Sequence, residues 1–223
     1  MLKICKMTKT YPETKIFQDV NLEIPLKSIV TVTGRNGIGK TTLLNILGGI
    51  SNFAGDVILT EVSLKNNYKD YIKLTTAIPN VPFLYDYLTV SEMIDLVISL
   101  SGVIEITAEE YKNKMIVDLE LKDFNSTLIK NLSLGTKQKV AFITAFLNSP
   151  KLVLIDEPFV NFDKSSMCKI LDFIKSYVLY TGAIVIFSTH SEEKKMNEIV
   201  THNIKINGFK DVVLSKVDGC HEI

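Results

Sequence analysis

A glycine-rich stretch has the residue types and spacing that bind phosphate. It fits the pattern G-x-x-x-x-G-K-[ST] with Gly34, Arg35, Asn36, Gly37, Ile38, Gly39, Lys40 and Thr41. Glycines open backbone torsions that other residues avoid, so successive N–H groups and the positive end of a following helix can surround an anion. Lys40 adds a mobile charge and the Thr41 hydroxyl can bind Mg²⁺, which predicts a nucleoside triphosphatase or a kinase.

Two carboxylates follow an apolar run in the second half of the chain. Residues 152–155 are Leu-Val-Leu-Ile, and Asp156 and Glu157 come next. Successive side chains of a strand point to opposite faces, so we expect the two carboxylates to have different tasks. Asp156 can hold the Mg²⁺ bound by Thr41, and Glu157 can act as a general base for a water that attacks the γ-phosphate.

A third motif lies between these two, at 132–139, and an apolar helical pattern follows it. Its sequence is Leu-Ser-Leu-Gly-Thr-Lys-Gln-Lys. Ser133 and the backbone of Gly135, at the start of a helix, offer a second anion-binding end. Taken alone, the same residues are more typical of an ordinary helix N-cap.

The elements that must position these motifs alternate between strands and helices. We expect strands at 29–33, 55–59, 74–78, 152–155 and 183–188, and helices at 40–48, 90–100, from about 107, 133–147 and 163–180. Thr107 with Glu110 three residues later resembles a capping box for the second of the central helices. Continuous apolar runs are typical of strands buried on both faces, so the pattern predicts an α/β fold built on a parallel sheet.

Composition narrows the class of protein further. The 223 residues carry 25 basic and 25 acidic side chains, and the only arginine is Arg35, which argues against a nucleic-acid binder. No apolar run approaches the ~20 residues that span a bilayer, the first residues lack the apolar core of a signal peptide, and three scattered cysteines suggest free thiols. We therefore expect a cytoplasmic protein.

In their order, these motifs resemble the nucleotide-binding domain of the ABC ATPases over nearly the whole chain. The Walker A motif looks like 34–42, the signature like 132–138, and Walker B like 152–156 with Glu157 as the catalytic carboxylate. The remaining similarities are single residues: Tyr11 to the aromatic that stacks on adenine, Asp163 to the end of the D-loop, and His190, after Ser188 and Thr189, to the switch histidine.

The resemblance implies a P-loop NTPase fold with a parallel-sheet RecA-like core, an N-terminal antiparallel β-subdomain and an inserted α-helical subdomain. It implies one ABC ATPase domain at 1–223, with the core at about 1–80 and 136–223 and the helical subdomain at about 81–135. It also implies ATP and Mg²⁺. The implied catalytic residues are Glu157, His190 and Asn80; the implied metal ligands are Thr41, Asp156 and Asn80; and the implied nucleotide contacts are Tyr11, Gly34, Arg35, Asn36, Gly37, Ile38, Gly39, Lys40, Thr41, Thr42, Ser133, Gly135, Lys137 and Asp163.

The resemblance further implies partners and a location. ATPase subunits of this family form a head-to-tail homodimer or heterodimer, in which the signature of one subunit closes over ATP bound by the other. An aromatic segment at 83–90, Phe-Leu-Tyr-Asp-Tyr-Leu-Thr-Val, stands where a membrane-spanning permease docks on the cytoplasmic face, although its apolar residues suit a subdomain core equally well. The compact chain is similar to bacterial exporter subunits of the ABC-2 or multidrug kind. The alternative is a soluble ATPase of cytosolic assembly machinery, of the iron–sulfur type.

The chain departs from the family pattern in two places. Asn80 stands where the family has a glutamine, and it is one methylene shorter, about 1.5 Å of reach. We expect slower hydrolysis and looser coupling from this change. Leu134 and Thr136 replace the usual Gly and Gln of the signature, while Ser133 and Gly135 are retained, so we expect an active enzyme.

Overall fold

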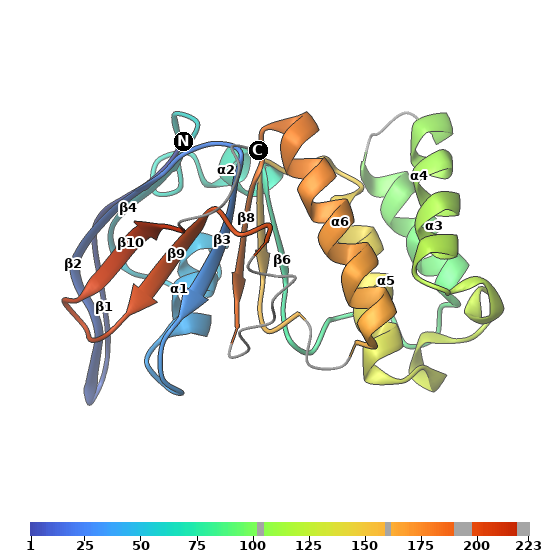
Figure 1. Cartoon of the computed structure of the whole chain (residues 1–223), viewed down its shortest axis with the longest axis horizontal. Helices are drawn as coiled ribbons and strands as arrows, with labels where there is room; N and C mark the ends of the chain where they lie inside the picture. The colour runs from blue at the N-terminus through green and yellow to red at the C-terminus, as the bar shows by residue number, and fades with distance from the viewer. Residues whose placement is uncertain (102–104, 159–161, 190–197, 218–223) are drawn as a thin grey trace.

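The computed structural model describes residues 1–101, 105–158, 162–189 and 198–217, without the side chains of 105–107. It has two sheets at one end of the molecule and a group of helices at the other (Figure 1). The N-terminus lies on the sheet side.

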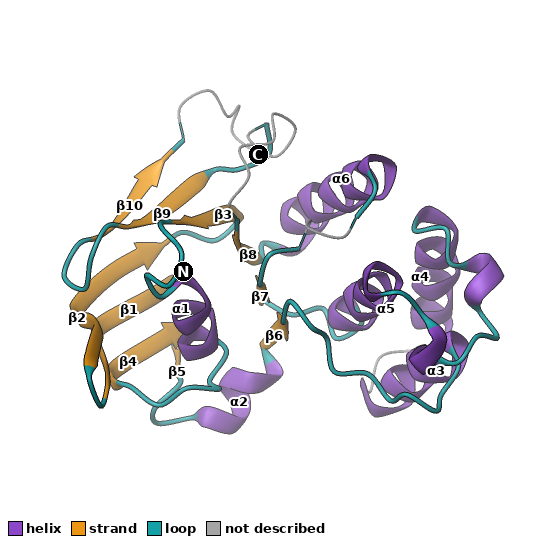
Figure 2. Ribbon diagram, turned by 90° about the horizontal axis from the view of Figure 1, so that it is seen from below, coloured by secondary structure: helices purple, strands orange, loops and turns teal. Residues whose placement is uncertain are grey.

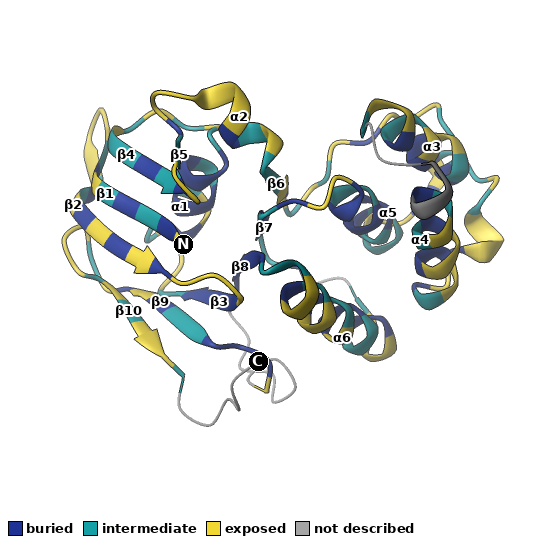
Figure 3. Ribbon diagram, turned by 90° about the horizontal axis from the view of Figure 1, so that it is seen from above, coloured by how far each residue is buried: buried dark blue, intermediate teal, exposed yellow. Residues whose placement is uncertain are grey.

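The first sheet is antiparallel and contains β1 (Leu2–Tyr11), β2 (Thr14–Ile24), β4 (Ala54–Leu59) and β5 (Val62–Ser63), in the order β2-β1-β4-β5. Buried and exposed residues alternate along its strands, as expected for a sheet with one covered face (Figure 3). This sheet corresponds to the β-subdomain that the resemblance implies.

The second sheet contains β3 (Ser28–Thr33), β6 (Thr75–Ile78), β7 (Leu152–Ile155), β8 (Ile184–Ser188), β9 (His202–Ile206) and β10 (Val212–Lys216). Its order is β10-β9-β3-β8-β7-β6, and every neighbouring pair is parallel except β10 with β9. The carboxyl ends of β3, β7 and β8 therefore meet at one edge, where loops of α/β proteins bind ligands.

The two hydrophobic cores lie on opposite faces of the second sheet, and successive residues of its central strands alternate between them. In β7, Leu152 and Leu154 belong to the core that includes helix α1 (Lys40–Leu47), whereas Val153 and Ile155 belong to the core that includes the helices at 90–101, 105–118, 134–146 and 164–181. In β8, Ile184 and Ile186 face α1 in the same way. If the alternation continues past the strand ends, Asp156 and Ser188 also face α1.

The six α-helices of the described ranges are α1 (Lys40–Leu47), α2 (Tyr68–Lys73), α3 (Val90–Ser101), α4 (Glu105–Asp118), α5 (Leu134–Phe146) and α6 (Lys164–Thr181). Two 3₁₀ turns, Lys122–Phe124 and Ile129–Asn131, connect α4 to α5. Helix α1 lies between the two sheets, and α3 to α6 gather on the other side of the second sheet (Figure 2). Within these ranges, the helices are all too short or too polar to cross a bilayer.

The α/β fold with a parallel sheet is confirmed, but one helix start was predicted wrongly. Helix α4 begins at Glu105, so Thr107 lies inside the helix and is not its N-cap. The capping box belongs instead to α3: Thr89 Oγ1 accepts the Glu92 N–H at 3.3 Å, and Glu92 Oε2 accepts the Thr89 N–H at 2.8 Å. The subdomain boundaries stay a prediction, because α5 contacts both α3 and β6.

Candidate functional site

The phosphate-type turn joins β3 to α1, and two of its glycines are required by close contacts. Gly34 has φ +153°, and a Cβ there would lie 2.7 Å from the carbonyl oxygen of Ile206. Gly39, the N-cap of α1, has φ +117°, and its Cβ would lie 2.6 Å from Cγ2 of Ile16. Any larger residue would move the backbone, so the shape of this turn depends on the glycines.

Lys40 is the first residue of α1, and its side chain folds back over the glycine-rich turn. Its Nζ donates hydrogen bonds to the carbonyl oxygens of Gly34 at 3.0 Å and Arg35 at 3.3 Å. Burial lowers the pKa of Lys40, and the nearby charges of Glu157 and Asp156 act in the opposite direction. The hydrogen bonds of the ammonium group go to neutral carbonyl oxygens, and an incoming anion would stabilise its charge.

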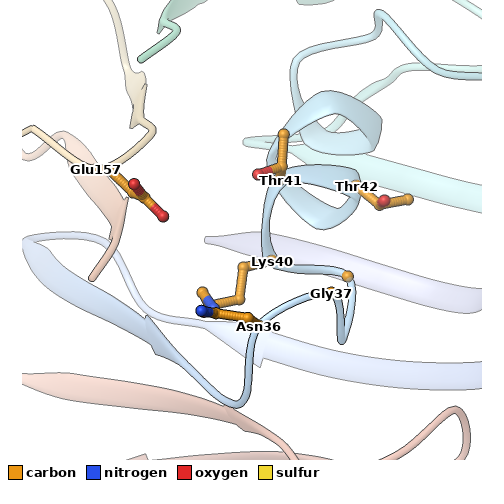
Figure 4. Close-up of a pocket in the computed structure, with 7 residues that line it drawn as sticks. Asn36, Gly37, Lys40, Thr41, Thr42 and Glu157 are labelled. Carbon is orange, nitrogen blue, oxygen red and sulfur yellow. The ribbon is translucent and has the colours of Figure 1, made fainter. Parts of the chain in front are cut away.

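A cavity of about 420 Å³ lies over the turn. Figure 4 shows Glu157 on one side of this cavity and the start of α1, with Lys40 and Thr41, on the other. The lining residues are Asn36, Gly37, Gly39, Lys40, Thr41, Thr42 and Glu157. Six of the predicted nucleotide contacts and the predicted base therefore surround one space.

Asp156 lies between α1 and β8. Its Oδ2 accepts the hydroxyl of Thr41 at 2.9 Å, and its Oδ1 accepts the hydroxyl of Ser188 at 2.5 Å. A hydroxyl and a carboxylate next to a phosphate-binding turn are the hard oxygen ligands that Mg²⁺ prefers. Thr41 and Asp156 therefore fit a magnesium ion.

Glu157 follows directly and has an unusual backbone. Its φ is +51°, in the left-handed region that costs residues other than glycine about 1–2 kcal/mol. Its N–H donates to Ser188 Oγ at 3.0 Å, which satisfies the turned peptide group. The left-handed backbone carries the carboxylate from the end of β7 to the cavity (Figure 4).

Asn80, just after β6, contacts the signature helix. Gln138 is 4% exposed, and its Nε2 donates to the backbone oxygen of Asn80 at 2.8 Å and to Asn80 Oδ1 at 3.4 Å. Gln138 and Asp156 also line one small cavity at the ends of β6 and β7. The loop at Asn80 is thus tied to α5 beside Asp156.

The other predicted residues of the signature lie at the start of α5 and are not among those that line the cavity over the turn. Ser133 is the N-cap of α5, and its Oγ accepts the N–H of Thr136 at 3.2 Å. Leu134, the first residue of the helix, is 39% exposed. Lys137 forms an ion pair with Asp86 at 3.6 Å. In this chain the segment acts as a helix cap, and Gly135 beside it is half-buried.

Two further predicted residues, Tyr11 and Asp163, are not among those that line the cavity. Tyr11 ends β1, is 45% exposed, and has Lys9 Nζ 4.8 Å from its ring centroid. Asp163 is the N-cap of α6: it accepts the Ser166 N–H at 2.8 Å and hydroxyl at 2.6 Å, and Lys139 lies 3.3 Å away. The hydrogen bonds from Ser166, with a smaller effect of Lys139, hold the pKa of Asp163 well below its usual range. His190 lies outside the described residues.

In the aromatic segment at 83–90, some apolar residues are exposed, as expected for a docking surface, and others are buried, as expected for a subdomain core. Phe83, Tyr85 and Tyr87 are 82%, 54% and 80% exposed, and the rings of Phe83 and Tyr85 meet edge to face at 5.6 Å. Leu84 and Val90 are buried in the core of the helical side. The segment is therefore anchored by its aliphatic residues and presents its aromatic ones outward.

Two residues of this region, Ser188 and Gln138, were not predicted as site residues. Ser188 had a usable sequence signal: it is a polar residue at the end of a buried strand, as Asp156 is directly after β7. Gln138 had no comparable signal, because its partner Asn80 is 58 residues away along the chain.

Comparisons with known proteins agree on one family. A sequence profile of the family described as ABC transporter matches residues 17–160. The chain is 29% identical over 220 residues to a putative hemin import ATP-binding protein, HrtA, of Staphylococcus haemolyticus (strain JCSC1435), covering 94% of this chain and 98% of that protein.

Two solved structures share the fold. One is an ATP-binding subunit of an ABC transporter, with a TM-score of 0.89, 24% identity and coverage of 98% of this chain and 90% of that chain. The other is a dimeric ATP-binding cassette in a post-hydrolysis state bound to ADP and phosphate, with a TM-score of 0.82, 24% identity and coverage of 98% and 100%.

Proposed function

Because this chain belongs to the ABC transporter family and is an ATPase, we propose that it is the ATP-binding and ATP-hydrolysing subunit of a membrane exporter. The observation that carries the ATPase part is the convergence of Lys40, Thr41, Asp156 and Glu157 around the glycine turn. Transport is supported by the family and by the relative named for hemin import.

ATP binding is the task of the turn and its neighbours. The N–H groups of residues 34–42 and the positive end of α1 would hold the phosphates. Lys40 Nζ would exchange the carbonyl oxygens of Gly34 and Arg35 for phosphate oxygens, and its pKa would rise as it does so. The exposed ring of Tyr11 is proposed to stack on the adenine.

Hydrolysis needs a base that accepts a proton from water and a cation that neutralises the negative charge of the phosphates. Thr41 and Asp156 would hold Mg²⁺, with Asn80 nearby, and the ion would neutralise phosphate charge. Glu157 accepts a proton from the water whose oxygen attacks the γ-phosphorus. The bond between that phosphorus and the bridging oxygen breaks, and ADP keeps the electron pair. His190 is proposed to contact the γ-phosphate.

A second subunit would complete the site. Phosphates bound in the cavity would be open on the side away from the turn, and the described residues that line the cavity include a single cation, Lys40. We propose that Ser133, Gly135 and Lys137 of a second ATPase subunit, together with the region of Asp163, cover that side. The dimeric structure with ADP and phosphate supports this arrangement at the level of the fold.

The aromatic segment is proposed as the docking surface for a membrane-spanning permease, which would hold the chain at the cytoplasmic face of the membrane. Two contacts connect this region with the signature helix: Asp86 with Lys137, and Asn80 with Gln138. Movement of the permease against the segment would therefore move α5 and the residues that cover the partner's ATP.

Co-purification tests the docking proposal. Wild-type chain expressed in a bacterial host together with its polytopic membrane partner should be recovered with it, and the change of Phe83, Tyr85 and Tyr87 to serine should abolish recovery. Tyr180→Ser is the matched control, because Tyr180 is 91% exposed at the end of α6. Recovery with a soluble scaffold protein, or equal loss in the control, would contradict the proposal.

The direction of transport is proposed from the signature. The sequence at 132–139 is similar to exporter subunits, whereas the Staphylococcus relative is named for import. Accumulation of cargo inside inverted vesicles on addition of ATP supports export, and its depletion supports import. The match to the ABC transporter family does not favour the alternative function, a soluble ATPase of a cytosolic assembly machinery.

A further inference from the structure

Ser188 at the end of β8 holds both carboxylate residues of the site with one hydroxyl group. Its Oγ donates to Asp156 Oδ1 at 2.5 Å and accepts the N–H of Glu157 at 3.0 Å. The side chain is fully buried. A serine hydroxyl has one proton and two lone pairs, so these bonds use its donor and one of its acceptors.

The register of the sheet explains why this residue reaches both partners. Ile155 of β7 is paired with Phe187 of β8, so the next residues, Asp156 and Ser188, lie side by side. The alternation of the two strands turns both side chains toward α1, where Thr41 donates to the other oxygen of Asp156. Ser188 thus closes a chain of contacts from α1 through Asp156 to Glu157.

The contact with Glu157 fixes a backbone that has no intrinsic preference for its conformation. At φ +51° the peptide N–H of Glu157 points to Ser188, and an alanine at 188 would leave that N–H without this acceptor. Loss of this acceptor carries a free-energy cost and would favour a rearrangement of the peptide group. The carboxylate of Glu157 would turn with it.

We propose that Ser188 is a positioning residue for ATP hydrolysis. Its hydroxyl sets the rotamer of Asp156 for the metal and the left-handed backbone of Glu157 for proton abstraction. This role rests on the proposed function of the site, and the fully buried hydroxyl of Ser188 acts through Asp156 and Glu157.

The test compares Ser188→Ala with Ser28→Ala in the full chain. Ser28 is 1% exposed and is paired with Ile184 at the opposite end of β8, and among the described residues its hydroxyl has no hydrogen-bond partner. Both variants remove one buried hydroxyl from the same pair of strands. Each is measured for ATP hydrolysis, for its dependence on Mg²⁺, for unfolding by urea, and for hydrogen exchange of the Glu157 amide.

Ser188→Ala should lower kcat about 10- to 100-fold, as expected for one buried hydrogen bond or two. The KM for ATP should stay within about twofold, the Mg²⁺ concentration for half-maximal rate should rise at least about threefold, and the Glu157 amide should exchange at least about tenfold faster. Ser188→Thr, which keeps a hydroxyl, should restore much of the rate. Ser28→Ala should resemble the wild type in all four measurements.

Equal losses in both alanine variants, or an unchanged Glu157 exchange rate in Ser188→Ala, would overturn the positioning role while leaving the ATPase assignment intact. Absence of Mg²⁺-dependent hydrolysis in the wild type would overturn the proposed function itself, and the positioning role with it. If Ser188→Thr does not fold, the positioning role is tested by two measurements on Ser188→Ala: the hydrogen-exchange rate of the Glu157 amide and the Mg²⁺ dependence of hydrolysis.

Discussion

A single methyl group at Gly39 should weaken ATP binding. The added Cβ would lie 2.6 Å from Ile16 Cγ2 and 3.1 Å from Phe17 Cζ, against about 3.5–4.0 Å for an ordinary carbon contact. Phe17 is fully buried, so it has little room to move. Overpacking of this kind costs about 1–3 kcal/mol, and the left-handed backbone adds about 1–2 kcal/mol.

Two other glycines serve as controls that separate the effect of the steric clash from the free-energy cost of the left-handed backbone. Gly37 in the same turn has φ +74°, and Gly182 at the C-cap of α6 has φ +69°. Apart from its own chain neighbours, a Cβ at either position meets no atom of the described residues within 4 Å. Gly182 precedes β8, at the edge of the sheet opposite the cavity. Alanine at these positions should therefore add only the backbone cost of about 1–2 kcal/mol.

The assay is equilibrium binding of a fluorescent ATP analogue, with urea unfolding of the same samples. Gly39→Ala should lose at least about tenfold in affinity, since about 1.4 kcal/mol corresponds to a factor of ten, and Gly37→Ala should lose less. Gly182→Ala should lose stability with its affinity unchanged. Wild-type affinity in Gly39→Ala, or an equal loss in Gly182→Ala, would refute the reasoning.

Three other substitutions address the N-cap of α6 and the contact between Asn80 and α5. Asp163→Ala removes the N-cap of α6 and should cost about 1 kcal/mol in urea unfolding at pH 7. Because the pKa of Asp163 is lowered in the folded state, the carboxylate stabilises the fold above its ordinary pKa, and this stabilisation is lost as pH falls through the folded-state pKa. The difference in unfolding free energy between the variant and the wild type should therefore shrink below about pH 4. A constant difference in unfolding free energy down to about pH 2 contradicts this. Gln138→Met keeps the side-chain volume but removes the donor to Asn80, and should lower kcat about tenfold with ATP affinity little changed; an equal fall in affinity would mean that it disturbs the fold. Asn80→Gln lengthens the amide and should raise the ATPase rate stimulated by the membrane partner without changing ATP affinity; loss of nucleotide binding would show that this loop is assigned wrongly.

The sequence predicted those parts of the fold that depend on local patterns. The apolar runs at 152–155 and 183–188 are strands, and the helices at 40–48 and 133–147 were correct to within one residue at each end. The start of α4 was wrong, because Thr107 with Glu110 satisfies the same local rule as Thr89 with Glu92 and only the latter stands at a helix end. Strands β9 and β10 and the short helix α2 were not predicted at all.

The candidate site was predictable where one motif supplies the geometry. The glycine turn determines the position of Lys40 and Thr41, and the end of β7 places Asp156 next to Thr41. The left-handed backbone that brings Glu157 to the cavity does not follow from strand alternation and was not predicted. The contacts of Ser188 and Gln138 were not predictable, because each depends on which residues pair across elements more than 30 positions apart in the chain. Register between β7 and β8, rather than any sequence pattern, places Ser188 beside Asp156.

The central claim is that Glu157 is the base of an ATPase closed by two subunits, and Glu157→Gln tests it most directly. The amide keeps the shape of the side chain but cannot accept the proton, so turnover should fall by about 10²- to 10⁴-fold. With ATP and Mg²⁺ the variant should elute from a sizing column as a dimer that retains ATP, while the wild type should elute as a monomer with ADP. A turnover within twofold of the wild type, or failure of the variant to retain ATP in a dimer, would contradict the account.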